Sequence, residues 1–358
     1  MEKFGFVGLP NAGKSSLYNA LAGGGALAAP YAFATVDPNV GVAKVPDPRL
    51  DLLAEMSQTK TIIPASVQFV DIAGLVKGAA QGEGLGNRFL SHIREVDAIV
   101  YVLRAFVDDD VPGSHDPLDQ LETLEIELVY ADVESLSKQI EKKRKASRVD
   151  AALADEVAAL DRALEVLERG VPIYRAGLDA DTRALLAPYF LLTDKVAMAV
   201  VNIDEGQLAD PEAATAGVAA ALGEGAEVIP ACIQLEAEAV LLDPEERAEM
   251  LDALGLGDGA LARFLRTAYH LLGLRTFFTT GEKETRAWTF RAGAKAPEAA
   301  GVIHTDFQRG FIRAECIGWE ELLAAGSWSK ARDAGTLRVE GKDYVVQDGD
   351  VMEFRFNV

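Results

Sequence analysis

The chain has 358 residues, a formal net charge of −21, 49% hydrophobic residues and 25% charged residues, which is an ordinary composition for two or three globular domains. Its acidity disfavours indiscriminate binding to nucleic acid, so any RNA contact needs a local basic patch and DNA is not an expected partner. The two cysteines, Cys232 and Cys316, form no disulfide framework, and the chain shows no signal peptide or membrane-spanning run, so we expect a cytoplasmic protein without a membrane partner.

Short apolar runs recur along the first two thirds of the chain, with helical segments between them. They lie at residues 4–8, 67–71, 98–106 and 195–202. Because these runs are apolar throughout instead of alternating, they are typical of parallel strands covered on both faces. The pattern predicts an α/β domain with a doubly wound sheet.

The first run leads directly into a phosphate-binding motif. Gly8 to Ser15 read G-L-P-N-A-G-K-S and fit G-x-x-x-x-G-K-[ST], between a strand and a helix. In such a loop, backbone N–H groups surround the phosphates, Lys14 reaches the β and γ oxygens, and Ser15 holds Mg²⁺. A glycine-rich turn without a ligand is the alternative. The predicted nucleotide-binding residues here are Asn11, Ala12, Gly13, Lys14, Ser15 and Ser16.

The second run ends in the D-x-x-G sequence of switch-type NTPases. Asp71 would hold the metal through water, and the N–H of Gly74 would sense the γ-phosphate. Thr35, in the loop between the first helix and the next strand, is placed to complete the coordination of Mg²⁺. We therefore predict Ser15, Thr35 and Asp71 as metal ligands, with Lys14 and Gly74 acting in catalysis.

Residues 118–170 consist of helix formers and predict an inserted antiparallel coiled-coil hairpin that turns near Ser147 to Asp150. Two ordinary surface helices are the alternative. The predicted seam of the second arm is Leu153, Val157, Leu160, Leu164 and Leu167. The predicted matching stripe of the first arm is Leu121, Leu124, Leu128 and Ala131.

One basic run, residues 138–148, stands at the predicted tip of this hairpin. In so acidic a chain its clustering is unusual and favours contact with RNA phosphates. A solvated helix face explains the same run equally well. The residues predicted to contact RNA or the ribosome are Lys142, Lys143, Arg144, Lys145 and Arg148.

After the last apolar run, Asn202, Ile203, Asp204 and Glu205 stand where a GTPase carries Asn-Lys-x-Asp. The aspartate of that motif accepts from N1–H and the 2-amino group of guanine, and adenine has neither donor. The amide of Asn202 suits adenine, so we interpret the stretch as an adenine-reading pocket. Residues 228–238 would supply its second wall, near Cys232 and Ile233. A strand end followed by exposed acids is the alternative.

From about residue 275 short strand-like segments predict a small, separate α+β domain. Together with "GLPNAGKSSLYNAL", "VDIAGLVKGAAQGEGLGNRFL" and "KETRAW", the segments "IHTDFQRGFIRAE" and "GKDYVVQDGDVMEFRFNV" make the chain resemble the ribosome-binding Obg-like ATPases, which are TRAFAC P-loop NTPases. The resemblance runs from Phe4 to Val358. It implies a nucleotide domain at 1–117 and 191–274, an inserted hairpin at 118–190, and a TGS domain of β-grasp fold at 275–358.

The resemblance also implies a preference for ATP, Mg²⁺, and association with ribosomal RNA and proteins in translation or stress response. Leu75 replaces the water-orienting glutamine of Ras-like enzymes, so intrinsic hydrolysis should be slow. In related cation-dependent NTPases a residue at the position of Asn11 helps to bind K⁺, and the family carries a proposed catalytic histidine in the loop of His115. A GTP-dependent switch of the Obg type is the alternative function.

Overall fold

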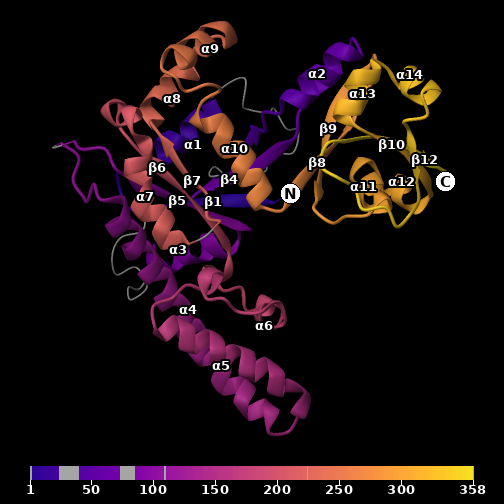
Figure 1. Cartoon of the computed structure of the whole chain (residues 1–358). Coiled ribbons are helices and arrows are strands. Elements are labelled where there is room, and N and C mark those ends of the chain that lie inside the picture. Colours follow the sequence, from indigo (N-terminus) through magenta and orange to yellow (C-terminus); the bar gives the residue numbers. More distant parts are fainter. Residues whose placement is uncertain (1, 24–39, 73–84, 109, 224, 358) are drawn as a thin grey trace. The chain divides into compact units, whose positions relative to one another are not determined.

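The computed structural model describes residues 2–23, 40–72, 85–108, 110–223 and 225–357 (Figure 1). The chain forms two compact units. The first consists of residues 1–42 and 68–264, and the second of residues 43–67 and 265–358. No helix in the described ranges is both long enough and apolar enough to cross a membrane.

A six-stranded sheet forms the centre of the first unit, with strand order β2-β4-β1-β5-β6-β7. The pairings of β1 with β4 and β5, of β5 with β6, and of β6 with β7 are parallel. Their carboxyl ends therefore meet at one edge, where such sheets bind ligands. The strands are β1 (Lys3–Val7), β2 (Val40–Lys44), β4 (Ser66–Asp71), β5 (Ala98–Arg104), β6 (Val196–Asn202) and β7 (Val228–Ala231).

Helices pack on both faces of this sheet, as successive side chains of β1 show. Phe6 contacts the ring of Phe264 in α10 (Ala260–Leu271), while Val7 joins the apolar cluster that contains Leu124 of α4 (Pro117–Ser147). Side chains of neighbouring residues in a strand point to opposite faces, so both faces are covered. The predicted doubly wound α/β fold is confirmed. The remaining helices of this unit are α1 (Lys14–Gly23), α3 (Leu85–Arg94), α6 (Ala180–Leu186), α7 (Pro211–Leu222), α8 (Ile233–Ala239) and α9 (Pro244–Ala253), and α10 begins in this unit and ends in the second.

The predicted inserted hairpin is also confirmed. Helix α4 (Pro117–Ser147) begins at a cap in which Asp116 accepts from the N–H of Leu118, and Pro117 occupies the first turn. A short 3₁₀ turn, η1 (Ala151–Leu153), leads into α5 (Ala154–Glu168). Figure 1 shows the two helices side by side, projecting from the first unit.

The predicted partner of the first arm is wrong. Leu121, Leu124, Leu128 and Ala131 belong to the core cluster of the sheet and not to the hairpin seam. The reason is length: α4 has 31 residues and α5 only 15, so the first half of α4 lies beyond the reach of α5. The hairpin core instead joins Leu136 and Ile140 of α4 to Leu160 and Leu167 of α5.

Two buried carboxylates of α4 fix the root of the hairpin, which we define as residues 117–132. Asp132 accepts from the N–H groups of Leu192 and Thr193, in η4 (Leu192–Asp194), at 3.0 and 2.8 Å. Glu125 accepts from Tyr174 and from Arg175, in η2 (Ile173–Arg175). Burial raises the pKa of both carboxyls, and these hydrogen bonds oppose the shift.

The second unit is built on a sheet with strand order β11-β10-β12-β8-β9-β3. Its edge strand β3 (Thr61–Ile63) comes from early in the chain and pairs in parallel with β9. This unit therefore includes residues 43–67, which the predicted boundaries place in the nucleotide domain. The other strands are β8 (Leu274–Thr279), β9 (Glu284–Arg291), β10 (Phe311–Gly318), β11 (Arg338–Glu340) and β12 (Asp350–Phe356). Its helices are α2 (Pro48–Met56), α11 (Ala296–Ile303), α12 (Thr305–Arg309), α13 (Trp319–Ala325) and α14 (Trp328–Asp333).

Candidate nucleotide-binding site

The loop between β1 and α1 has the backbone that its glycines predict. Gly13 adopts a φ of 101°, and a Cβ at this position would come within 2.5 Å of Nδ2 of Asn202. A Cβ at Gly8 would come within 2.5 Å of the carbonyl oxygen of Val102. Only glycine fits such contacts, so the two residues allow the loop to lie directly against β5 and β6.

Lys14 is buried at the start of α1, and its ammonium lies within the loop itself. Its Nζ donates to the carbonyl oxygens of Gly8 and Leu9, at 3.0 and 2.9 Å. Burial lowers the pKa of Lys14, and the nearby carboxylate of Asp71 partly opposes the shift. The loop thus holds one desolvated positive charge beside the N–H groups at the start of a helix, an arrangement that suits bound phosphates.

Ser15 and Asp71 form the part of the site suited to a metal. The hydroxyl of Ser15 donates to Oδ2 of Asp71 at 3.2 Å, across the carboxyl ends of two neighbouring strands. Oδ1 of Asp71 is buried and has no hydrogen-bond partner among the described residues. A hydroxyl and a carboxylate are hard oxygen donors, so this pair fits Mg²⁺. Thr35 and Gly74, also predicted here, lie outside the described residues, as does Leu75.

Asn202 connects three elements at the end of β6. Its Nδ2 donates to the carbonyl oxygen of Ala12 at 3.2 Å, and its Oδ1 accepts from the N–H of Ile233 at 3.3 Å. The backbone carbonyl of Asn202 also accepts from Ala105 and Phe106. The side chain thus ties the phosphate loop to α8, and an amide hydrogen and an oxygen lone pair are left for a ligand.

The residues after Asn202 have separate roles. Ile203 is only 2% exposed and belongs to the core cluster of the sheet. Asp204 and Gln207 form a reciprocal cap on η5 (Glu205–Ala209), so the carboxylate of Asp204 is used by the backbone. Glu205 is exposed at the pocket rim. Of this stretch, Glu205 has the carboxylate most available to a ligand.

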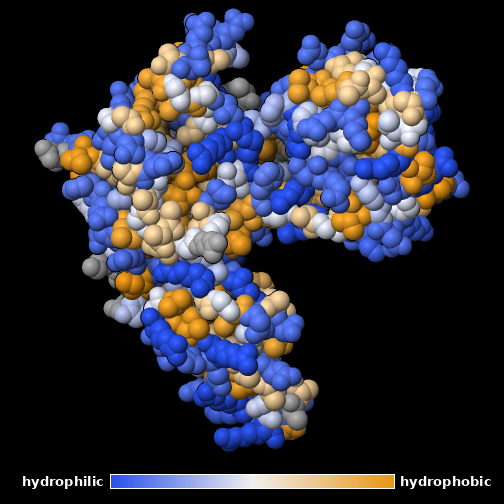
Figure 2. Space-filling view, in the orientation of Figure 1, coloured by the Kyte–Doolittle hydropathy of each residue, from blue (hydrophilic) through white to orange (hydrophobic). Residues whose placement is uncertain are grey.

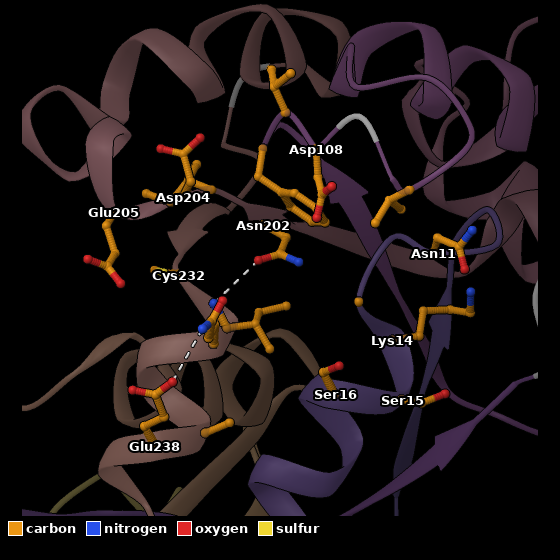
Figure 3. Close-up of a pocket in the computed structure, with 18 of the residues that line it drawn as sticks. Asn11, Lys14, Ser15, Ser16, Asp108, Asn202, Asp204, Glu205, Cys232 and Glu238 are labelled. Atoms are coloured by element: carbon orange, nitrogen blue, oxygen red, sulfur yellow. Dashed lines mark hydrogen bonds between the residues drawn. The ribbon is translucent and has the colours of Figure 1, made fainter.

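One cavity of about 1110 Å³ connects the phosphate loop, Asn202 and Glu205. In Figure 3, Lys14 and Ser15 lie on one side of it, Glu205 and Glu238 lie on the opposite side, and Asn202 lies between them. The cavity brings together the predicted residues Asn11, Gly13, Lys14, Ser15, Ser16, Asn202, Ile203, Glu205, Cys232 and Ile233. Ala12 is buried beside them and accepts from Asn202.

The sequence predicted the wall formed by residues 228–238, which includes Gln234, Ala237 and Glu238, but it did not predict the wall formed by the segment after β5. That segment had a usable signal, because loops at the carboxyl end of a parallel strand commonly form ligand sites. The missed residues are Phe106, Val107, Asp108, Val111 and Leu241.

His115 does not lie in this cavity. It is exposed and lines a separate hollow of about 270 Å³ together with Leu118, Gln207 and Gly217. The phosphate loop still touches this segment, because Nδ2 of Asn11 donates to the carbonyl oxygen of Pro112 at 3.5 Å. The geometry therefore gives His115 no contact with the phosphate-binding residues.

The basic run at the hairpin tip divides into paired and unpaired cations. Lys143 donates to both carboxylate oxygens of Glu156 at 2.8 Å, and Arg144 pairs with Asp161 at 2.7 Å. These two residues join α4 to α5. Lys142, Lys145 and Arg148 are exposed and have no ion-pair partner in the described part of the chain. The far end of the hairpin is largely hydrophilic in the view of Figure 2.

Comparison with known proteins identifies the family. The chain is 48% identical over 362 residues to the ribosome-binding ATPase YchF of Bacillus subtilis (strain 168), covering 99% of both chains. It is 45% identical over 360 residues to the protein of the same name from Escherichia coli O157:H7, again covering 99% of both. The chain belongs to the YchF family. A solved structure titled as the Schizosaccharomyces pombe YchF GTPase matches with a TM-score of 0.89 and 35% identity, covering 99% of this chain and 97% of that one.

Two family models match parts of the chain. One, described as a 50S ribosome-binding GTPase, matches residues 3–152, and the YchF-GTPase C-terminal model, described as a protein of unknown function, matches residues 274–357. These matches confirm a P-loop nucleotide hydrolase with the C-terminal domain of YchF proteins. The relatives are named both as ATPases and as GTPases, so their names do not decide which base this chain binds. That question depends on the chain's own residues at the predicted base pocket.

Proposed function

We propose that this chain is a cytoplasmic, ATP-hydrolysing switch that associates with the ribosome and acts in translation or stress response. The observation that carries the nucleotide part is the cavity that connects Lys14, Ser15 and Asn202. The names of the curated relatives, ribosome-binding ATPases, support the rest.

In the proposed phosphate site, Lys14 exchanges its loop carbonyls for the β and γ oxygens of ATP. The backbone N–H groups of residues 12–16 surround the phosphates, with the helix dipole of α1 behind them. Ser15 and Asp71 would hold Mg²⁺, together with Thr35, and Gly74 would sense the γ-phosphate. When bound, Mg²⁺ neutralises charge on the β and γ oxygens. Asn11 contributes to a K⁺ site beside the phosphates.

Hydrolysis by the isolated protein is proposed to be slow. Leu75 has no group that can orient water, and His115 lines a different hollow in this structure. Catalysis by His115 would require the segment around it to turn toward the phosphates. We therefore propose that the protein is a binding switch. ATP binding selects its conformational state, and hydrolysis returns it to the other state.

Preference for ATP rests on the contrast with a guanine pocket. The amide of Asn202 remains, Ile203 is committed to the core, and the exposed carboxylate of Glu205 is one methylene longer than aspartate. The GTP-dependent alternative has support only from the names of some relatives.

The test is to measure ATP and GTP affinities side by side. We expect tighter binding of ATP, and we expect Glu205→Asp to move the preference toward GTP because it moves the carboxylate nearer to the guanine-reading position. Glu238→Asp, at another exposed acid on the pocket rim, is the control and should not change the ratio. A wild-type chain that binds GTP tenfold better than ATP, about 1.4 kcal/mol, would overturn the ATP assignment.

A further inference from the structure

The segment that follows β5, residues 105–108 and 110–116, is here called the connecting loop. It begins at the nucleotide cavity, where Phe106, Val107, Asp108 and Val111 form one wall. It ends at Asp116, the cap of the hairpin helix α4. The loop therefore runs directly from the nucleotide site to the root of the hairpin.

Arg104, the last residue of β5, holds the first half of the connecting loop. It is 3% exposed, and its guanidinium donates to the carbonyl oxygens of Phe106, Asp108 and Val111 at 3.0, 3.1 and 2.9 Å. It also stacks on the ring of Phe106, 4.5 Å from the centroid. Within the described residues this buried cation has no carboxylate partner, so its hydrogen bonds go to the loop that forms the cavity wall.

Gln120, in the first turns of α4, holds the second half of the connecting loop. It is 1% exposed, and its amide donates to the carbonyl oxygens of Ser114 and Asp116 at 3.2 and 3.1 Å. The same side chain accepts from the N–H of Arg104 and donates to its carbonyl oxygen, at 2.9 and 2.7 Å. Gln120 therefore bonds both to the backbone of Arg104 and to the end of the loop.

We propose that Arg104 is a positioning residue for bound nucleotide, and that Gln120 couples it to the hairpin, so that nucleotide binding and the root of α4 stabilise each other through the connecting loop. Arg104 itself does not line the cavity. It acts by fixing Phe106 and the carbonyl groups behind the cavity wall. The coupling is reciprocal, because a nucleotide that favours one loop arrangement also favours the α4 contacts made in that arrangement.

This proposal rests on nucleotide binding at the cavity, and not on the identity of the base. The planar guanidinium of arginine can donate to three carbonyl oxygens at once, whereas the single ammonium of lysine cannot reproduce that geometry. The substitution Arg104→Lys keeps the charge and removes the fork.

Arg49 in the second unit supplies a matched control. Its guanidinium makes three hydrogen bonds, to Asp47 and Asp348, and lies 5.2 Å from the centroid of the ring of Phe278. It does not line the nucleotide cavity. Arg49→Lys therefore tests what losing a half-buried guanidinium fork does to the protein as a whole.

The first experiment measures the Kd and KM for ATP with Mg²⁺, together with kcat and Tm, in the full-length chain. We expect Arg104→Lys to weaken ATP binding about tenfold, as a lost charged hydrogen bond would. We expect kcat to change little, and Arg49→Lys to lower Tm without moving Kd. Wild-type affinity in folded Arg104→Lys would overturn the positioning role. If the wild type prefers GTP, the ATP assignment fails, and the same comparison with GTP still tests Arg104.

The second experiment follows hydrogen exchange at the start of α4 with and without ATP. In the wild type, ATP should slow exchange in residues 118–124. Gln120→Met, which keeps the volume and removes the amide, should still bind ATP but lose that difference. Exchange that is indifferent to ATP in the wild type, or an ATP effect that persists in Gln120→Met, would overturn the coupling.

Discussion

The nucleotide cavity and the hairpin tip both present cations in an acidic chain, and they hold them in opposite ways. Lys14 is buried, and two backbone carbonyls fix its ammonium. Lys142, Lys145 and Arg148 are exposed, and no described carboxylate pairs with them. A fixed, desolvated charge recognises phosphate by geometry, and a solvated cluster attracts phosphates by the sum of its charges. Phosphate binding at Lys14 should therefore depend on individual atomic contacts, whereas phosphate binding at the hairpin tip should depend on the salt concentration.

The largest effect is expected at the buried charge. Lys14→Ala should lower ATP turnover by about 10²–10³-fold, because a fixed donor to developing charge is lost from a site of low dielectric constant. Turnover and ATP affinity are to be measured together with Tm, which should change far less. Unchanged turnover in the folded variant would contradict the assignment of the phosphate loop.

A smaller, salt-dependent effect is expected at the tip. Reversing Lys142, Lys145 and Arg148 to glutamate should weaken co-sedimentation with ribosomes and flatten its salt dependence by about one unit of slope for each lost phosphate contact. Intrinsic ATPase should stay near wild type. The 31 residues of α4 span about 46 Å, well beyond the Debye length of about 8 Å in physiological salt.

Lys138→Glu is the control for this experiment, because the charge of Lys138 is already paired with Glu134 on the same helix. It should change ribosome binding less than a reversal of Lys142 or Lys145 does. If the triple variant and the wild type give the same binding curves at every salt concentration, the basic run is a solvated helix face and the docking surface lies elsewhere.

The smallest effect is expected on stability, at Glu156, which pairs with Lys143 near the hairpin tip. The hydrogen bonds from Lys143 and Tyr189 hold the pKa of Glu156 below its ordinary value. A carboxyl whose pKa is lowered by folding contributes stability above its unfolded pKa and loses it as the pH falls through the folded one. The difference in Tm between wild type and Glu156→Gln should therefore be present at pH 7 and shrink toward pH 3. A difference that is constant over this range would show that the carboxylate charge contributes nothing.

The sequence predicted the parts of this molecule that depend on local patterns. The spacing of Gly8, Gly13 and Lys14 determines a loop of known backbone, and the helix formers after Leu118 determine two helices. It did not predict the packing partner of Leu121 and Leu124, because an apolar stripe looks the same whether it faces a second helix or a sheet.

Two features of the site could not be predicted from the sequence. Ile203 was expected in the base pocket and does line the cavity, but it is 2% exposed and also belongs to the core cluster, since a strand end carries buried and exposed positions side by side. The contacts of Arg104 and Gln120 depend on bonds to backbone carbonyls, which every residue possesses and no pattern reveals. The predicted roles of the site residues, including Thr35, Gly74 and His115, remain predictions.

The entry of β3 into the second sheet bears on how the chain is made. Residues 61–63 are synthesised more than 200 residues before their partner β9, and the strands β10 to β12 follow later still. The sheet therefore cannot be completed until residue 356 has been synthesised, and such non-local pairing is slow. A fragment beginning at residue 265 would leave β9 as an unpaired edge that invites association with other chains. The second unit is therefore best produced with residues 43–67 attached.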